Sequence, residues 1–471
     1  MALNLVRNSK VYFTSNVDQS TGVVLTTGFT AGNTNEIQVL DGFTFSQNTN
    51  ADVVTISEAG VSPVRGQRSF NTSLAPVDFS LSNYLRPANS GTAITAEEAP
   101  LWNALLSPNA ISTANSVTVS GVSGATYAFL AGAATITLSG TSMTYSGITV
   151  GDVVVVSGLS HATDGLILNS SATVLTLSAT AITLDVVNPK AAGAAISAIT
   201  TGTVKLHRSA WAPIDANYSL VTSGGSNVNQ LQKFGMIFIV DSVVYVVDNC
   251  AMNQVTIDFG LDAIATAAWT GQGTALKQSA TITASTLAAA TAKNTSAPFI
   301  TNKLSTVSLK LVNSIGAATA GTTYAVALTG GSITINNNIT YVTPANLGTV
   351  NIPTTYYTGT RAITGSMTAY LKTGAGVGST GQLLADMLAA ASSSVEPMAA
   401  LTIAVGGATN ATKVVFEMPA ITLSIPTVDV QQVVSTSINF TAEGHTSSAT
   451  ADGNAFALDE INDVSVRYYS A

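Results

Sequence analysis

The sequence is poor in charge. Of its 471 residues 9% are charged, against about 25% in a typical globular chain. Because charged residues normally occupy the surface, we expect much of the surface to face other protein. The net charge of −8 argues against a nucleic-acid binder, which needs clustered Lys and Arg to neutralise phosphates.

Cysteine and histidine are scarce as well. Cys250 is the single cysteine, which excludes an intrachain disulfide and a cysteine metal cluster. His161, His207 and His445 have no Cys or His neighbour at metal-ligand spacing. The glycine-rich stretch 374–378 lacks a phosphate-binding lysine, and no Gly-x-Ser-x-Gly motif occurs. We therefore predict neither an enzyme nor a bound cofactor or metal.

Long apolar runs are also missing. Residues 1–7 lack the apolar core of a signal peptide. The most apolar run, residues 234–247, is interrupted by Asp241 and is too short to span a bilayer. The mean hydropathy of +0.37 argues against disorder. We expect a folded protein without a membrane-spanning segment, made in the cytoplasm of its cell.

Short Val-, Ile-, Thr- and Tyr-rich segments separated by Gly, Asn, Ser and Pro dominate the chain, a pattern typical of an all-β protein. Residues 10–14, 36–40 and 52–56 are examples. Helical periodicity occurs at residues 97–106, where Pro100 fits the first turn, and at 381–390. The Ala-rich stretch 287–293 is interpreted as linker.

The two predicted helices each follow a similar strand, residues 80–86 and 366–372, at an offset of 286. Residues 42–48 resemble 332–338 at an offset of 290, and residues 254–259 resemble 435–440 at 181. The change from 286 to 181 indicates about 105 extra residues in the first copy. Chance similarity between Ser/Thr/Val-rich strands is the alternative to a duplication.

These offsets predict an all-β fold with two tandem β-sandwich or barrel modules, one short helix in each. Residues 1–110 and 206–272 would form the first module, 273–302 a linker and 303–471 the second module. Residues 111–205 would form an inserted small β domain, either a barrel or an immunoglobulin-like sandwich, that projects from the surface.

Two strands combine an apolar face with a polar face. An ordinary solvated surface and the lining of a hollow both fit this alternation. The polar residues are Gln254, Thr256, Asp258, Ser435, Ser437 and Asn439.

Several segments, taken together and in order, carry a resemblance to a known family. They are residues 58–60, 65–74, 101–105, 330–344, 365–371, and 425–427 leading to 436–440. The chain resembles the duplicated tail tube proteins of long-tailed bacteriophages, especially the type that forms trimeric rings in non-contractile tails.

The resemblance implies a structural virion protein whose trimeric, pseudo-hexameric rings stack into a tube that conducts the genome into the host. It implies a closed β-barrel around a lumen that the six polar residues would line. The implied partners are further copies of the chain, a tape-measure protein, tail-tip and tail-terminator proteins, and transiently passing DNA. Loops 46–68 and 336–354 are candidates for ring-to-ring contact, with Asn48, Asn50, Asp52, Glu58, Arg65 and Arg68 as candidate residues.

Two departures from the family pattern stand out. The insertion at 111–205 has no counterpart, and the chain ends soon after the second module, where one type of member carries an immunoglobulin-like domain. The inner tube of a contractile tail and a Ser/Thr-rich β adhesin or surface-layer protein are the alternative interpretations.

Overall fold

The computed structural model describes part of the chain, in these segments: residues 8–57, 65–89, 94–106, 116–130, 133–145, 148, 150, 153–160, 168, 171–186, 200–207, 211–213, 218–222, 231–261, 263–293, 298–311, 322–372, 379–390, 398–406, 412–430, 433–443 and 463–469. These residues are mostly β, with two short helices, and their sheets are antiparallel. The all-β class predicted from the Val- and Thr-rich segments is confirmed at this level.

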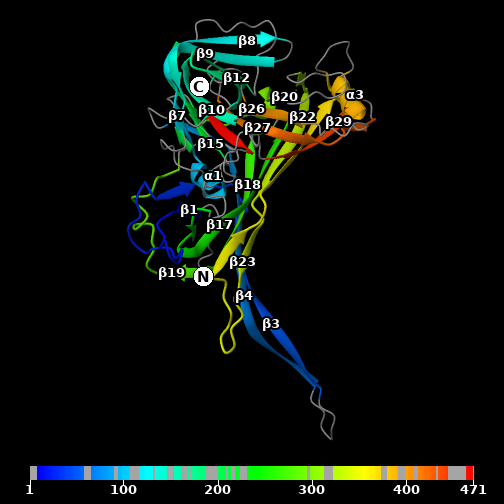
Figure 1. Cartoon of the computed structure of the whole chain (residues 1–471). Coiled ribbons are helices and arrows are strands. Elements are labelled where there is room, and N and C mark those ends of the chain that lie inside the picture. Colours follow the sequence, from blue (N-terminus) through cyan, green and yellow to red (C-terminus); the bar gives the residue numbers. More distant parts are fainter. Residues whose placement is uncertain are drawn as a thin grey trace.

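One large sheet contains two sets of strands that follow each other in the chain (Figure 1). We call the first set the N-set: β1 (Lys10–Thr14), β2 (Thr34–Ile37), β3 (Thr44–Ser57), β4 (Arg65–Tyr84), β16 (Phe234–Val240), β17 (Val243–Gly260), β18 (Thr266–Gly273) and β19 (Ala275–Ser279), with helix α1 (Ala99–Leu106). We call the second set the C-set: β20 (Thr306–Leu311), β21 (Thr323–Ala325), β22 (Leu328–Asn336), β25 (Ala362–Tyr370), β26 (Met398–Gly406), β27 (Lys413–Leu423), β28 (Thr427–Asp429), β29 (Ser435–Ala442) and β30 (Ser465–Tyr469), with helix α3 (Thr380–Ala390).

Strand pairing follows the same order in both sets. The N-set pairs β1–β2, β1–β16, β16–β17, β17–β18, β18–β4, β4–β3 and β17–β19. The C-set pairs β20–β21, β20–β26, β26–β27, β27–β29, β29–β25, β25–β22 and β27–β30. Each strand of one set thus has a counterpart in the other with matching neighbours.

These pairings correct two details of the sequence comparison. The counterpart of β29 is β18, because each pairs with the strand that ends in Tyr84 or Tyr370; residues 254–259, which the sequence aligns with 435–440, lie on β17 instead. Thr44 pairs with Ser80 and Ser332 pairs with Ser366, so the offset between β3 and β22 is 288 and not 290. Neighbouring strands with the same alternation of small polar and apolar residues align almost equally well, which explains both shifts.

The two sets join edge to edge through β17 and β22, from Gln254 opposite Asn336 to Gly260 opposite Gly330. Their inward side chains form one shared core, in which Trp102 of α1 packs edge-on against Trp269 at 4.9 Å between ring centroids. Burying a Val, Leu, Ile, Phe or Met side chain of such a core stabilises a fold by about 1.5–3 kcal/mol. The β3–β4 hairpin leaves this body and extends well beyond it (Figure 1).

Seven strands that lie between α1 and β14 (Trp211–Pro213) in the sequence form a separate sheet. Its strands are β7 (Ser116–Thr118), β8 (Ser120–Leu130), β9 (Ala133–Thr144), β10 (Val153–Ser160), β11 (Ser171–Ser178), β12 (Ala181–Val186) and β13 (Thr200–His207). The sheet closes into a small barrel, because β13 pairs with β7 and β7 continues through Val119 into β8. The barrel has its own hydrophobic core, and its Asp185 forms an ion pair with the buried Lys310 of β20.

The remaining described elements are short: β5 (Pro87–Asn89), β6 (Ile94–Ala96), β14 (Trp211–Pro213), β15 (Tyr218–Thr222), the 3-10 helix η2 (Asn302–Leu304), β23 (Ile339–Val342) and β24 (Thr355–Thr358). β15 pairs with β30, so the C-terminal strand lies between β15 and β27. The Ala-rich stretch 287–293 forms turns, and its Leu287 is buried.

Candidate functional site

The six polar residues predicted from alternation lie on one face of the large sheet. Asp258 of β17 stands opposite Ser332, which stands opposite Ser366, which stands opposite Asn439 of β29. Side chains directly opposite each other in antiparallel strands point to the same side of the sheet. The structure therefore brings the two separated strands together in one surface, which we call the polar face.

Hydroxyl groups on the polar face bond to each other across strands. Thr256 and Thr334 are 3.2 Å apart between their Oγ1 atoms, and the Nε2 of Gln254 donates to Thr256 at 3.2 Å. Ser332 and Ser366 lie 3.4 Å apart between their Oγ atoms. Polar atoms on this face thus bond to one another within and between strands.

The charges on the polar face are all negative among the described positions that we assign to it. Carboxylates are present at Asp78, Asp258 and Asp429. The other positions are Thr44, Ser46, Ser80, Ser82, Tyr84, Gln254, Thr256, Gly260, Thr266, Ala268, Thr270, Gln272, Gly330, Ser332, Thr334, Asn336, Ala362, Thr364, Ser366, Thr368, Tyr370, Thr427, Ser435, Ser437, Asn439 and Thr441.

As far as the described residues go, the row of strands from β3 through β4, β18, β17, β22, β25 and β29 to β28 is open at both ends. In the described residues β3 pairs only with β4, and β28 only with β29. Asp429 faces Ser435 as Asp258 faces Thr266, so β28 is the counterpart of the C-terminal half of β17. Ile257 of β17, which pairs with β22, is fully buried in the core, whereas the matching Val428 at the open edge is 41% exposed. An exposed strand edge with apolar side chains is a template for pairing with another chain.

The β3–β4 hairpin carries the candidate ring-to-ring residues. Asn48, Asn50, Asp52 and Arg68 are exposed. Glu58 lies outside the described residues, and Arg65 is described only as part of the β4 backbone.

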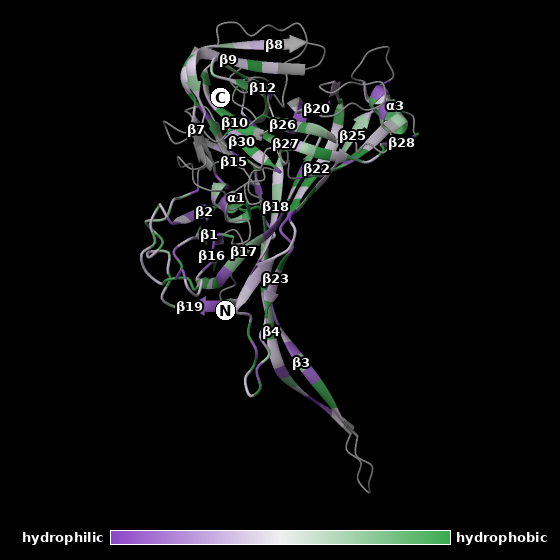
Figure 2. Cartoon of the chain, viewed as in Figure 1, coloured by the Kyte–Doolittle hydropathy of each residue, from purple (hydrophilic) through white to green (hydrophobic). Residues whose placement is uncertain are grey.

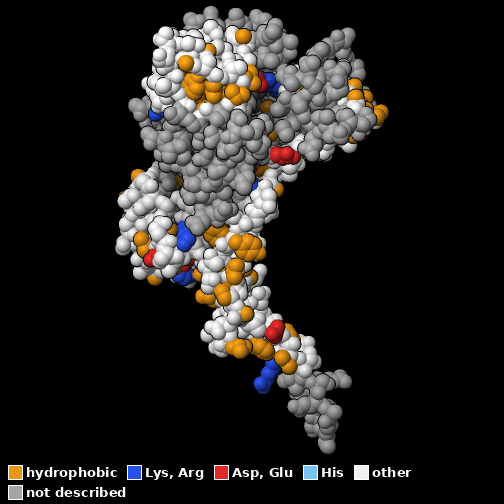
Figure 3. All heavy atoms as spheres, in the orientation of Figure 1, with side chains coloured by type: hydrophobic (Ala, Val, Ile, Leu, Met, Phe, Trp, Pro, Cys, Tyr) orange, Lys and Arg blue, Asp and Glu red, His pale blue; other side chains and the backbone are white. Residues whose placement is uncertain are grey.

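Apolar side chains that the sequence analysis did not single out are exposed on the same hairpin. Val53, Val54 and Phe70 are 57%, 49% and 53% exposed. Figure 3 shows hydrophobic side chains gathered along this stem, and Figure 2 shows hydrophilic and hydrophobic residues following one another along it. The hairpin is thus mixed in character rather than a purely polar loop.

A second projection, which contains β23 and β24, runs beside the hairpin. The backbone N–H of Leu74 donates to the Asn351 carbonyl at 2.8 Å, and the Asn351 N–H donates to Thr72 at 3.1 Å. This projection also exposes apolar residues, with Leu347 99% exposed. The two projections therefore present a joint surface at the same end of the molecule.

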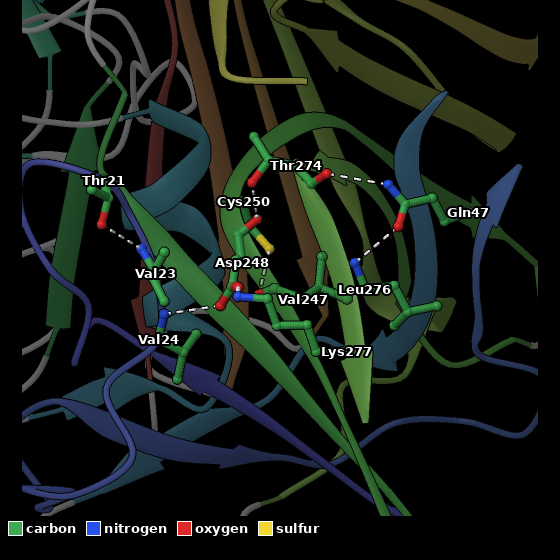
Figure 4. A network of polar contacts seen from close by, with 10 residues as sticks. All are labelled: Thr21, Val23, Val24, Gln47, Val247, Asp248, Cys250, Thr274, Leu276 and Lys277. Carbon is green, nitrogen blue, oxygen red and sulfur yellow. Dashed lines mark hydrogen bonds and ion pairs between the residues drawn. The ribbon is translucent and has the colours of Figure 1, made fainter. Parts of the chain in front are cut away.

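A polar network holds the base of the hairpin (Figure 4). Gln47 of β3 donates to the carbonyls of Ala75 and Thr274 at 3.0 and 3.2 Å and accepts from the Leu276 N–H at 3.1 Å. Nearby, the buried Asp248 accepts from the Val24 N–H at 2.9 Å and pairs with Lys277 at 2.5 Å. Sequence reasoning missed this network, because its members come from five segments that are separated in the chain.

A second buried cluster joins the C-terminal strand to α1. The Nε1 of Trp102 donates to the Tyr468 hydroxyl at 2.6 Å, and that hydroxyl donates to Glu98. Burial raises the pKa of Glu98 to about 8, so the carboxyl is neutral in the folded protein at neutral pH.

The described residues contain no group of three or more His, Cys, Asp or Glu that could hold a metal ion. Cys250 is fully buried, and burial raises the pKa of its thiol, which disfavours the nucleophilic thiolate. His161 and His445 lie outside the described residues, and His207 is described only as part of the β13 backbone. In the part of the chain that the structure describes, we find no helix whose length and apolar character suit a bilayer crossing.

No protein-family model matches the sequence. The chain is 23% identical over 378 residues to the tail tube protein pb6 of Escherichia phage T5. The match spans 79% of this chain and 58% of that protein, less than two thirds of its length. This match confirms the resemblance to tail tube proteins: the chain is a distant homologue of tail tube protein pb6 of Escherichia phage T5.

Proposed function

We propose that this chain is the structural subunit of a phage tail tube, in which copies join edge to edge into rings and the rings stack. The pair of open edges at β3 and β28 is the observation that supports this most directly. The homology to a tail tube protein points the same way.

In this proposal the N-set and C-set are two copies of one module. The matched order of pairings supports a duplication, since unrelated sheets would have no reason to share it. Residues 1–110 and 206–272 belong to the first module, 303–471 to the second, and 273–302 link them. The barrel within 111–205 is an addition to the first module.

The same duplication predicts which strands pair between neighbouring copies of the chain in a ring. Within the chain, β17 of the first module pairs with β22 of the second. The counterparts of these strands are β28 and β3, so β28 of one copy pairs with β3 of the next. Because Asp258 faces Ser332, the matching Asp429 would face Thr44 of the neighbouring copy.

Such a contact joins two different surfaces and closes into a ring at a fixed number of copies. Three copies would supply six modules, the number implied by the resemblance to trimeric-ring tube proteins. Closure removes both open edges, the usual solution to the edge problem in β-barrels.

The polar face lines the inside of this ring. Its Ser, Thr and Asn side chains and its carboxylates offer phosphates no fixed cation, so DNA can slide past without being held. Stacked rings, a tape-measure protein inside during assembly, and tip and terminator proteins at the two ends complete the proposed tube, located in the virion. No catalytic role is proposed.

Negative-stain electron microscopy of the purified chain tests the proposal. Rings with threefold symmetry, or tubes, are expected. A population of isolated monomers at concentrations of tens of micromolar would contradict it.

A further inference from the structure

Many of the exposed large apolar side chains gather in two groups at opposite ends of the large sheet. One group belongs to the hairpin and its neighbouring projection: Val53, Val54, Phe70, Val342, Leu347, Val350, Ile352 and Tyr357. The other group lies where the strands end at the far side: Leu261, Ile264, Phe299, Tyr370, Val430 and Val433. We call this second group the strand-end patch.

Contacts place the first half of the strand-end patch together. The ring of Phe299 packs edge-on against Tyr84, the last residue of β4, at 5.3 Å between centroids. Ile264 forms a bridge with Thr301, two residues after Phe299. Leu261 directly follows the last residue of β17.

The second half of the patch repeats the first. Tyr370 ends β25 as Tyr84 ends β4, and the backbone N–H of Leu371 donates to the Val434 carbonyl at 3.0 Å. Val433 precedes Ser435 by two residues, as Ile264 precedes the matching Thr266. Val433 is 60% exposed and Ile264 is 37% exposed. Both strand sets therefore present an apolar residue at the same position of the same end.

Exposed apolar groups on a soluble chain usually mark a protein contact. Here two such surfaces lie at opposite ends of the large sheet. The β3–β4 hairpin and the segment between β22 and β25 form the first, and residues at or next to strand ends of both sets form the second. Figure 3 shows hydrophobic side chains on the hairpin stem and, far from it, at the end where α3 and β28 lie. Two different surfaces that fit each other head to tail generate an open filament.

We propose that the strand-end patch of one ring receives the apolar hairpin surface of the next ring, and that Ile264 and Val433 are central to this contact. The proposal rests on the proposed function and adds the receiving surface to it. The bound partner is a second copy of this chain, and burial of apolar surface drives the contact. Charged groups lie beside both apolar surfaces: Asp52 and Arg68 are exposed on the hairpin, and the guanidinium of Arg86 lies 4.6 Å from the ring centroid of Phe299.

The test uses two classes of variant of the full chain. The patch variant is Ile264→Glu with Val433→Glu, and the hairpin variant is Val53→Glu with Phe70→Glu. A matched control places Glu at two comparably exposed apolar residues elsewhere, Val23→Glu with Leu175→Glu, which are 39% and 40% exposed. Electron microscopy and light scattering then report rings and tubes separately.

We expect the patch variant and the hairpin variant each to form single rings without tubes, and the control to form tubes. When the two defective variants are mixed, each ring still has one intact surface, so stacks of two rings should form and grow no longer. Tubes of normal length from the patch variant would overturn the inference, and so would a mixture that stays as single rings. Absence of rings from the unmodified chain would instead contradict the proposed function.

Discussion

Trp102 and Tyr468 stand 366 positions apart in the sequence and share a buried hydrogen bond of 2.6 Å. Trp102 belongs to the helix of the N-set, and Tyr468 to the last strand of the C-set. Phe416 of β27 packs near the same indole, at 6.3 Å between ring centroids. Through this hydrogen bond the last described strand, β30 of the C-set, contacts the helix of the N-set within a single chain.

Tyr468→Phe should lower the stability of the folded chain by removing this contact between the two strand sets. The substitution keeps the ring but leaves the buried Nε1 of Trp102 without its acceptor, a loss of about 1–3 kcal/mol in the free energy of unfolding. Urea denaturation of the unassembled chain measures the change. Tyr357→Phe, at a tyrosine that is 57% exposed, is the matched control and should change the free energy by less than about 0.5 kcal/mol.

The neighbouring Glu98 predicts a dependence of stability on pH. Its pKa is about 8 in the folded protein against an ordinary value of 4.5, because burial disfavours the charged form. The folded state therefore holds a proton that the unfolded chain releases above pH 4.5. This contribution to the free energy of unfolding is fully present below about pH 4.5 and is lost as the pH rises towards 8, by at most about 1.4 kcal/mol per pH unit.

Glu98→Gln removes the titrating group while keeping an uncharged side chain of similar shape. The unfolding midpoint of this variant should fall less between about pH 5 and pH 8 than that of the unmodified chain. Glu443→Gln, at an exposed glutamate, should keep the original slope. Identical slopes for the Glu98→Gln variant and the unmodified chain would show that Glu98 does not carry this proton.

Lysine on the polar face should slow the passage of DNA. Asp258→Lys combined with Asn439→Lys places fixed cations where the lumen is proposed to lie, and each can hold a phosphate. Genome ejection from particles built with this variant should be slower, and the slowing should shrink as salt rises. Thr176→Lys on the inserted barrel is the control and should leave the rate unchanged. Equal ejection rates for both variants would count against this lining of the channel.

Much of the fold was predictable from the sequence, because it depends on local alternation. The polar residues of 254–258 and 435–439 were identified from their period of two, and the structure places both groups on one face. Both helices were likewise found from periodicity, the first of them also from Pro100 in its first turn.

Long-range strand pairing was not predictable, because the residues of a single strand do not determine which distant strand it pairs with. Three features depend on strands far away in the chain: the equivalence of β29 and β18, the alignment of β3 with its counterpart β22, and the closure of the inserted barrel. The networks of Gln47 and of Tyr468 have the same cause. The apolar surface of the hairpin was overlooked since Val53 and Val54 in a strand usually signal a core position.

The register at the open edges gives the most direct test of the central claim, that β28 of one copy pairs with β3 of the next. Residues directly opposite in an antiparallel pair have Cα atoms about 4.5–5.5 Å apart, within disulfide range. The double variant Thr44→Cys with Asp429→Cys, in a Cys250→Ala background, should therefore oxidise to covalent dimers and closed trimers on non-reducing gels. Thr44→Cys with Val428→Cys shifts the register by one residue, so its thiols point to opposite faces and should cross-link little. Absence of oligomers from the first variant, or equal cross-linking by both, would contradict the account.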